Sequence, residues 1–158
     1  MSNENTGLNL NALDLTGLKS IVDTFINSYK STLENKGKRA TGNLTNSIKG
    51  KVKVSGKYII VSLNLEDYWK YVEYGRRPGK FPPVNKIREW IRVKPILPQP
   101  SSGRLPTVNQ LAFLIGRSIA RNGIKPTNAL KQTINDFDLV GKIYDFLEEE
   151  IQKQISEI

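Results

Sequence analysis

The sequence predicts an α+β protein: a small antiparallel β-sheet, formed by a hairpin over about residues 48–65, packed against several α-helices, with two long proline-rich loops. Two patterns indicate this class. Apolar residues over 16–33 and 107–122 recur at the i, i+3, i+4, i+7 spacing of one buried helical face. Residues 52–61 instead alternate on both sides of a glycine turn, as a β-hairpin does. At 158 residues, the chain is about one domain long.

The first fifteen residues are polar, rich in asparagine and without a period, so we expect an N-terminal arm over 1–15. A single α+β domain follows over 16–158. The start has neither a basic leader nor the apolar stretch of a secretion signal. No apolar run approaches the roughly 18 residues of a membrane helix, so we expect synthesis in the cytoplasm and no membrane partner.

A first helix is expected over Thr16–Leu33. Its predicted buried face consists of Leu18, Ile21, Val22, Phe25, Tyr29 and Leu33. Residues 34–39 then form a loop. Residues 41–48 form either one short helical turn or an extended lead-in to the hairpin.

The hairpin turns at Ser55-Gly56 or at Gly56-Lys57, and both turns give the same pairing parity. One face of the sheet then carries the apolar residues Ile48, Val52, Val54, Ile59, Val61, Leu63 and Leu65. The opposite face carries Lys49, Lys51 and Lys53. Because an isolated hairpin is marginal in water, we expect helices or further strands to cover the apolar face.

A short aromatic helix follows the hairpin. Glu66 and Asp67 are expected to cap it, and it runs to Tyr74, with Gly75 as a typical residue after a helix end. We expect at least half of Tyr68, Trp69 and Tyr71 to close the hydrophobic core over the hairpin.

Glycine and three prolines make residues 76–83 the first long loop, and residues 93–106 form the second. The helix between them, over about 83–92, buries Val84, Ile87 and Ile91, with Trp90 at its edge. We interpret Trp90 as a core residue of this helix in preference to a surface that stacks on nucleic-acid bases.

Thr107 is a natural N-cap for a helix through Asn122, which Gly123 closes. Its predicted buried face consists of Val108, Leu111, Ala112, Ile115 and Ile119. A C-terminal helix over 139–158 is expected to bury Val140, Ile143, Tyr144, Leu147, Ile151, Ile155 and Ile158.

Composition removes most familiar catalytic chemistry. The chain has no cysteine, which excludes disulfides, thiolate metal sites and cysteine nucleophiles, and no histidine, the usual general base. The remaining catalytic hypothesis is a magnesium-dependent nuclease that uses Glu66, Asp67 or Glu73. The favoured interpretation is structural: the first two lie at a helix N-terminus, and Glu73 pairs with Arg76 or Arg77. We therefore expect no enzyme, no cofactor and no metal.

Charge is segregated along the chain, whose formal net charge is +9. Between Arg76 and Lys125 there are eleven basic residues and one acid, Glu89, whereas from Asp136 onward seven acids face two lysines. One interpretation is nucleic-acid binding through phosphates. Another is head-to-tail assembly, in which the acidic end of one copy meets the basic middle of the next. Solubility alone explains any single charge but is a poorer explanation of the segregation.

The segment Tyr-Val-Glu-Tyr-Gly at 71–75, with its Arg/Pro loop, is similar to a family of tailed-bacteriophage proteins. These are the tail-completion or neck proteins that join head to tail. Members resemble this chain in a Thr-Gly-Asn-Leu lead-in, here at 41–44, followed by a hairpin and that motif. The segment at 112–126 also looks like phage homologues. The resemblance covers about 36–127, and the basic proline-rich insertion is longer here than in many relatives.

The resemblance implies a structural virion protein in an oligomeric ring at the head–tail junction. Its partners would be copies of itself, portal- or adaptor-side proteins and tail-side proteins. Tyrosine and arginine are enriched at interfaces, and proline lowers the entropy that a docking loop loses. We therefore predict an interface made of Tyr71, Tyr74, Gly75, Arg76, Arg77, Pro78, Lys80, Phe81, Pro82, Pro83 and Arg104. The alternative for Arg76, Arg77 and Lys80 is that they lie in solvent at the tip of the loop.

Three further cations, Arg117, Arg121 and Lys125, are predicted to contact DNA or an acidic partner. This basic segment also supports a competing function, that of a cytoplasmic nucleic-acid-binding accessory protein. No helix-turn-helix or RNA-recognition motif is legible, so only general contact with the nucleic-acid backbone is expected.

Overall fold

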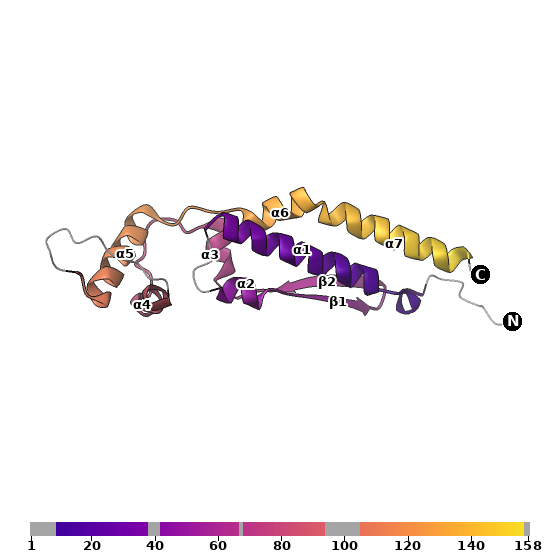
Figure 1. The fold of residues 1–158 in the computed structure, drawn as a ribbon, viewed down its shortest axis with the longest axis horizontal. Coiled ribbons are helices and arrows are strands. Elements are labelled where there is room, and N and C mark those ends of the chain that lie inside the picture. The colour runs from indigo at the N-terminus through magenta and orange to yellow at the C-terminus, as the bar shows by residue number, and fades with distance from the viewer. Residues whose placement is uncertain (1–8, 38–41, 67, 94–104, 157–158) are drawn as a thin grey trace. The chain divides into compact units, whose positions relative to one another are not determined.

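The structure, a computed structural model, describes residues 9–37, 42–66, 68–93 and 105–156. Figure 1 shows its elements in chain order. They are a 3-10 helix η1 (Leu10–Ala12), α1 (Thr16–Asn35), α2 (Asn43–Ser47), β1 (Lys49–Ser55), β2 (Tyr58–Asn64), α3 (Trp69–Tyr74), α4 (Val84–Val93), α5 (Val108–Asn122), α6 (Ala129–Phe137) and α7 (Leu139–Ser156). The predicted α+β class is confirmed.

The chain divides into two compact units, each assembled from separate stretches. The first contains Met1–Thr32, Ile48–Leu65 and Leu130–Ile158, and the second contains Leu33–Ser47 and Glu66–Ala129. Because each unit draws on distant parts of the chain, no single cut separates them. The predicted single domain stays a prediction.

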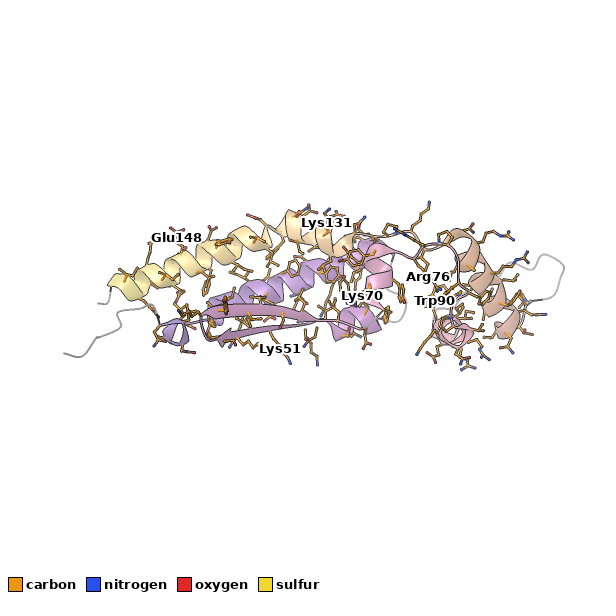
Figure 2. The ribbon with its side chains drawn as sticks, turned by 180° about the vertical axis from the view of Figure 1, so that it is seen from behind. Lys51, Lys70, Arg76, Trp90, Lys131 and Glu148 are labelled. Carbon is orange, nitrogen blue, oxygen red and sulfur yellow. The ribbon has the colours of Figure 1, made fainter. Side chains whose placement is uncertain are left out.

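The hairpin of the first unit follows the predicted parity. β1 and β2 pair antiparallel with Val52 opposite Val61, and Gly56-Lys57 is the turn, which decides between the two predicted turns. The apolar face is buried or half-buried as predicted, while the three lysines of β1 are exposed. Figure 2 shows Lys51 on the side of the hairpin away from α1.

α1 covers the apolar face of the hairpin and runs along it (Figure 1). A Cβ built on Gly50 of β1 would lie closer to Val22 than real Cβ atoms come, and it would also press on Ile26. Glycine at this position therefore lets the helix approach the strand closely. The buried residues of α1 are Leu18, Val22, Phe25, Ile26, Tyr29 and Leu33. The predicted face is confirmed except that Ile21 is half-buried and Ile26 joins the core.

α6 is a helix that the sequence analysis did not anticipate. It ends at Phe137, and the next residue, Asp138, adopts a φ of 52° and separates it from α7. The Phe137 and Phe25 rings pack in a T-shaped arrangement with their centroids 5.8 Å apart, and the Thr133 hydroxyl donates to the Thr32 hydroxyl at 3.0 Å. These contacts fix α6 on α1.

α7 begins at Leu139 as predicted, but its predicted buried face is wrong in part. Val140, Tyr144 and Ile155 are exposed, and no described residue of α7 is fully buried. The helix instead approaches α1 through Phe146, which lies where a Cβ on Gly17 would be. Ile158 lies outside the described residues.

The predicted arm over 1–15 is described only from residue 9 onward. There, η1 is capped by the Asn9 side chain, which accepts from the backbone N–H of Asn11. Leu13 is buried, and Gln154 of α7 donates to the Asn9 carbonyl at 3.3 Å. This part of the chain therefore contacts α7 within the first unit.

α4 and α5 form the hydrophobic core of the second unit. Ile87, Ile91 and Ala112 are buried, with Val84, Trp90, Leu111 and Ile115 packed against them. Trp90 is thus a core residue, as expected. Thr107 and Gln110 form a reciprocal capping box at the start of α5, which confirms the predicted N-cap.

Two details of the second unit correct the sequence analysis. Val108 is exposed rather than buried, because the apolar stripe of α5 begins only at Leu111. The N-cap of α3 is Tyr68, which makes no side-chain cap, so the role expected of Glu66 is wrong; Asp67 lies outside the described residues. The alternative left open at 41–48 is decided in favour of a helical turn, α2.

Among the described helices, none combines the length and the apolar character that crossing a bilayer would need.

Candidate protein interface

Two distant segments of the second unit pair side by side just after α3 and α5. The backbone N–H of Arg76 donates to the Ile124 carbonyl at 2.9 Å, and the N–H of Ile124 donates back to the Arg76 carbonyl at 2.8 Å. Gly79 N–H adds a third bond, to the Ala120 carbonyl at 2.8 Å. We call this pairing the Arg76–Ile124 bridge. It attaches the segment that follows α3 to the C-terminal end of α5.

The C-terminal end of α3 is held by the segment that follows α5. Thr127 donates twice to the Val72 carbonyl, from its backbone N–H at 3.1 Å and from its hydroxyl at 2.7 Å. Asn128 N–H donates to the Glu73 carbonyl at 3.1 Å. Carbonyls that would be left without partners at a helix end therefore find them in residues more than fifty positions away.

Two glycines make the bridge possible. Gly75 has a φ of 70° and Gly123 a φ of 72°, in the left-handed region that favours glycine. A Cβ on Gly75 would collide with the Ile124 carbonyl, and one on Gly123 would collide with the Arg76 carbonyl; both would fall under the 3.0 Å that real Cβ atoms respect. Each glycine thus faces the backbone of the other segment.

The first predicted loop, 76–83, is consequently held along its length by contacts with α5 and does not project freely. Phe81 stacks on Phe113 of α5 with ring centroids 5.7 Å apart, and it occupies the space beside Gly116. Pro82 is buried. The Arg76 guanidinium donates to the Lys80 carbonyl at 2.8 Å and is half-buried. Figure 2 labels Arg76 and Trp90 in this unit.

These contacts sort the predicted interface residues into two groups. Gly75, Arg76 and Pro82 serve the internal packing of the loop, and a contact of theirs with a partner stays a prediction. The remaining described ones are exposed: Tyr71, Tyr74, Arg77, Pro78, Lys80, Phe81 and Pro83. Arg104, in the second predicted loop, lies outside the described residues.

α3 presents its tyrosines to solvent. Tyr71 is 55% exposed and Tyr74 66%, and Tyr68 at the N-cap is exposed as well. Trp69 is half-buried, with its ring 5.8 Å from that of Tyr74. The expectation that at least half of Tyr68, Trp69 and Tyr71 close the core is therefore wrong, because two of the three are exposed.

The three predicted cations beyond the loop, Arg117, Arg121 and Lys125, are all exposed. Sequence reasoning missed that Phe113 and Leu114 share the outer surface of α5 with the two arginines. A signal was present: residues 111–115 are all apolar, and five consecutive positions span more than a full helical turn. One buried face cannot accommodate them all.

The metal hypothesis gains no support from the described residues. Glu73 is buried within α3, whereas Glu66 is exposed. No group of three or more acidic side chains in the described ranges is placed to hold a metal ion. Asp67 lies outside these ranges, and the ion pair expected between Glu73 and a neighbouring arginine stays a prediction.

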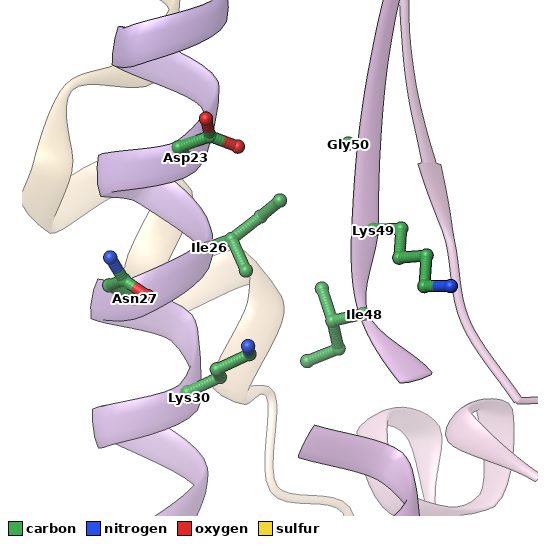
Figure 3. A pocket seen from close by; sticks show the side chains of 7 residues that line it. All are labelled: Asp23, Ile26, Asn27, Lys30, Ile48, Lys49 and Gly50. Carbon is green, nitrogen blue, oxygen red and sulfur yellow. The ribbon is translucent and has the colours of Figure 1, made fainter. Parts of the chain in front are cut away.

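A hollow of about 460 Å³ lies along the edge of the first unit between α1 and β1. Figure 3 shows Ile26 and Ile48 pointing toward each other across it, while the Lys49 side chain points away. Asp23 and Lys30 complete its rim with opposite charges. Gly50 also lines the hollow, to which we assign no ligand.

Comparison with known proteins gives no match to this chain among protein-family models, curated proteins or solved structures.

Proposed function

We propose that this chain is a non-enzymatic structural protein of a tailed bacteriophage, forming part of an oligomeric ring at the head–tail junction and acting by protein–protein docking. The observation that carries the proposal is the exposure of Tyr71 and Tyr74 on a short helix whose end is fixed by the Arg76–Ile124 bridge. Arg77 and Lys80 lie exposed on the attached loop.

Docking through this surface would bury area and would also cost little conformational entropy. Tyrosine offers a large amphipathic surface with few rotatable bonds, and tyrosine and arginine dominate the energetics of interfaces. A loop that is already tied to α5 loses little further freedom when it docks. An exposed tyrosine cluster on a rigid support is therefore the arrangement expected of a preformed binding surface.

The sequence resemblance supplies the setting: a ring in the virion, with portal- or adaptor-side and tail-side proteins as neighbours and copies of the chain beside it. Segregated charge suits such a ring, since heterologous contacts join unlike surfaces of identical subunits.

The test compares exposed tyrosines of the two units. We expect the double variant Tyr71→Ala/Tyr74→Ala to enter phage particles at least about tenfold less than the wild type, the loss expected when hot-spot aromatics are truncated. Tyr58→Ala, on the outer face of the hairpin, is the matched control and should enter normally. Quantitative mass spectrometry of purified particles gives the readout. A wild-type chain that is absent from particles and strictly monomeric would contradict the proposal.

A second candidate, a nucleic-acid-binding accessory protein, is favoured by one observation. Arg117, Arg121 and Lys125 are exposed, and the sequence from Trp90 to Asn135 contains no acid. Three phosphate contacts predict that log K falls with log salt at a slope of about −2.7, and Arg117→Ala should reduce that slope by about 1. DNA binding that is undetectable or insensitive to salt would remove this candidate.

A further inference from the structure

We propose that the outer surface of α5 on one copy docks against the outer surface of α7 on the next copy, so that subunits join head to tail. The inference deepens the proposed assembly function and rests on it for the existence of an oligomer. It identifies the surfaces of α5 and α7 as the two that meet in that oligomer.

The first surface, the basic α5 face, consists of Phe113, Leu114, Arg117 and Arg121. Phe113 is 55% exposed even though its ring stacks on Phe81, and Leu114 is 53% exposed. Both arginines are exposed and lie one and two turns beyond Phe113 on the same side of the helix. This surface is therefore apolar at one end and cationic at the other.

The second surface, the acidic α7 face, consists of Val140, Tyr144, Glu148 and Ile155. Tyr144 is 70% exposed, and the two aliphatic residues are exposed as well. Glu148 is exposed one turn beyond Tyr144, and Figure 2 labels it on α7. Asp145 and Glu149 beside it are also exposed. These spacings are those of a buried helical face, yet nothing in the described chain covers it.

Charge selects the pairing of these surfaces. Two basic α5 faces would bring four arginines together, and two acidic α7 faces would bring like carboxylates together, so each self-contact is opposed. The α5 face against the α7 face brings apolar residues and opposite charges into contact. Apolar burial then supplies affinity, while the charges set register and exclude the wrong pairing.

The spacing along the two helices also agrees. Arg117 follows Phe113 by four residues, and Glu148 follows Tyr144 by four residues. At a rise of 1.5 Å per residue, each aromatic lies about 6 Å along the axis from its charge. Helices laid parallel in this register would bring ring to ring and guanidinium to carboxylate. Because every copy carries both faces, the contact repeats and generates a ring or a filament.

The test is charge reversal followed by mixing. We expect Arg117→Glu and Glu148→Arg each to weaken self-association of the full chain by at least about tenfold, because each places like charges in contact. An equimolar mixture of the two variants should associate again, since every contact between unlike copies carries either the native pair of charges or the reversed pair. Lys57→Glu and Asp136→Arg, which change exposed charges elsewhere by the same amount, are the controls and should associate normally. Sedimentation velocity at low and high salt measures the association.

Each outcome decides the matter. Association of either single variant at wild-type strength overturns the inference, as does a mixture that fails to recover while circular dichroism shows both variants folded. A wild-type chain that is monomeric at every concentration overturns it too. The proposed function fails separately, if the chain is absent from particles; a wild-type oligomer that ignores these substitutions leaves that function standing and removes only this contact.

Discussion

Replacing Gly123 by alanine tests the Arg76–Ile124 bridge directly. The substitution adds a single methyl group, which must lie where the Arg76 carbonyl now is, and it places an L-residue at a φ of 72°. Neither problem is relieved by moving a side chain, because the obstructing atom belongs to the backbone. We therefore expect the bridge to open or the two segments to separate.

The expected loss of stability is the sum of the cost of the left-handed conformation and the cost of losing the two bridge hydrogen bonds. A left-handed conformation costs a residue with a Cβ about 1–2 kcal/mol. The two reciprocal bridge bonds, at 2.8 and 2.9 Å, contribute about 1 kcal/mol each to stability when made. Gly123→Ala should thus lower the free energy of unfolding by about 3–4 kcal/mol. Gly37→Ala is the matched control: its φ is 65°, but among the described residues no atom beyond its chain neighbours lies within 4 Å of the added Cβ, so only the cost of the left-handed conformation applies.

The assay is guanidinium unfolding followed by tryptophan fluorescence. The only two tryptophans, Trp69 and Trp90, both belong to the second unit, so their emission reports on the unit that contains the bridge. Circular dichroism on the same samples reports on helices of both units. If Gly123→Ala and Gly37→Ala lowered the free energy of unfolding by the same amount, within about 0.5 kcal/mol, the expected collision at Gly123 would be refuted. The structural importance of the bridge would be refuted with it.

Three further substitutions test other parts of the structure. Ile91→Ala, in the core between α4 and α5, should cost about 2–5 kcal/mol in the same unfolding assay; a cost under about 1 kcal/mol would mean that this core is not packed as described. Gly50→Ala should cost about 1–3 kcal/mol by forcing α1 off the hairpin at Val22, and a neutral or stabilising effect would show that the close approach is absent. The pKa of the Asp14 carboxyl is held below 3.8 by hydrogen bonds from Thr16, first from its side chain and then from its backbone N–H. The stability that these bonds contribute is present above pH 3.8 and is lost as the pH falls through the lowered pKa. Thr16→Ala should raise that pKa toward 3.8 in an NMR titration, and an unchanged value would exclude the side-chain bond as its cause.

Local patterns in the sequence were sufficient for the hairpin and for most helix positions. Strict alternation has a period of two, so a two-residue turn at either predicted place leaves Val52 and Val61 on the same face. Thr107 and Gln110 signal a helix start through their own side chains. Both features depend on residues close together in the chain, and the sequence therefore contains the information needed to place them.

The same patterns do not say what covers a helix face. The spacing of Val140, Tyr144 and Ile155 correctly indicates an apolar stripe on α7, but that stripe is exposed within the described chain. Amphipathic periodicity is equally satisfied by the protein's own core and by a partner. α6 was missed for another reason: it has only nine residues, so its apolar positions 130, 134 and 137 follow the i, i+4, i+7 spacing over little more than two turns.

The bridge also escaped prediction, since its two glycines are far apart in the chain and each resembles an ordinary residue after a helix end. In the structure, the motif at 71–75 and the segment at 112–126 meet through the backbone contacts that Gly75 and Gly123 permit. Each of these two segments therefore depends on the other, because each glycine faces the backbone of the opposite segment.

It follows that the exposed tyrosines of α3 and the basic α5 face are held on one support, although they belong to different helices. Opening the bridge should then displace the tyrosines relative to α5 without removing a single contact residue. Gly123→Ala is therefore expected to lower incorporation into particles even at temperatures where circular dichroism shows the protein folded, whereas Gly37→Ala should not. If folded Gly123→Ala protein entered particles normally, the tyrosine surface and the α5 surface would have to act independently, and the bridge would not be needed to hold them together.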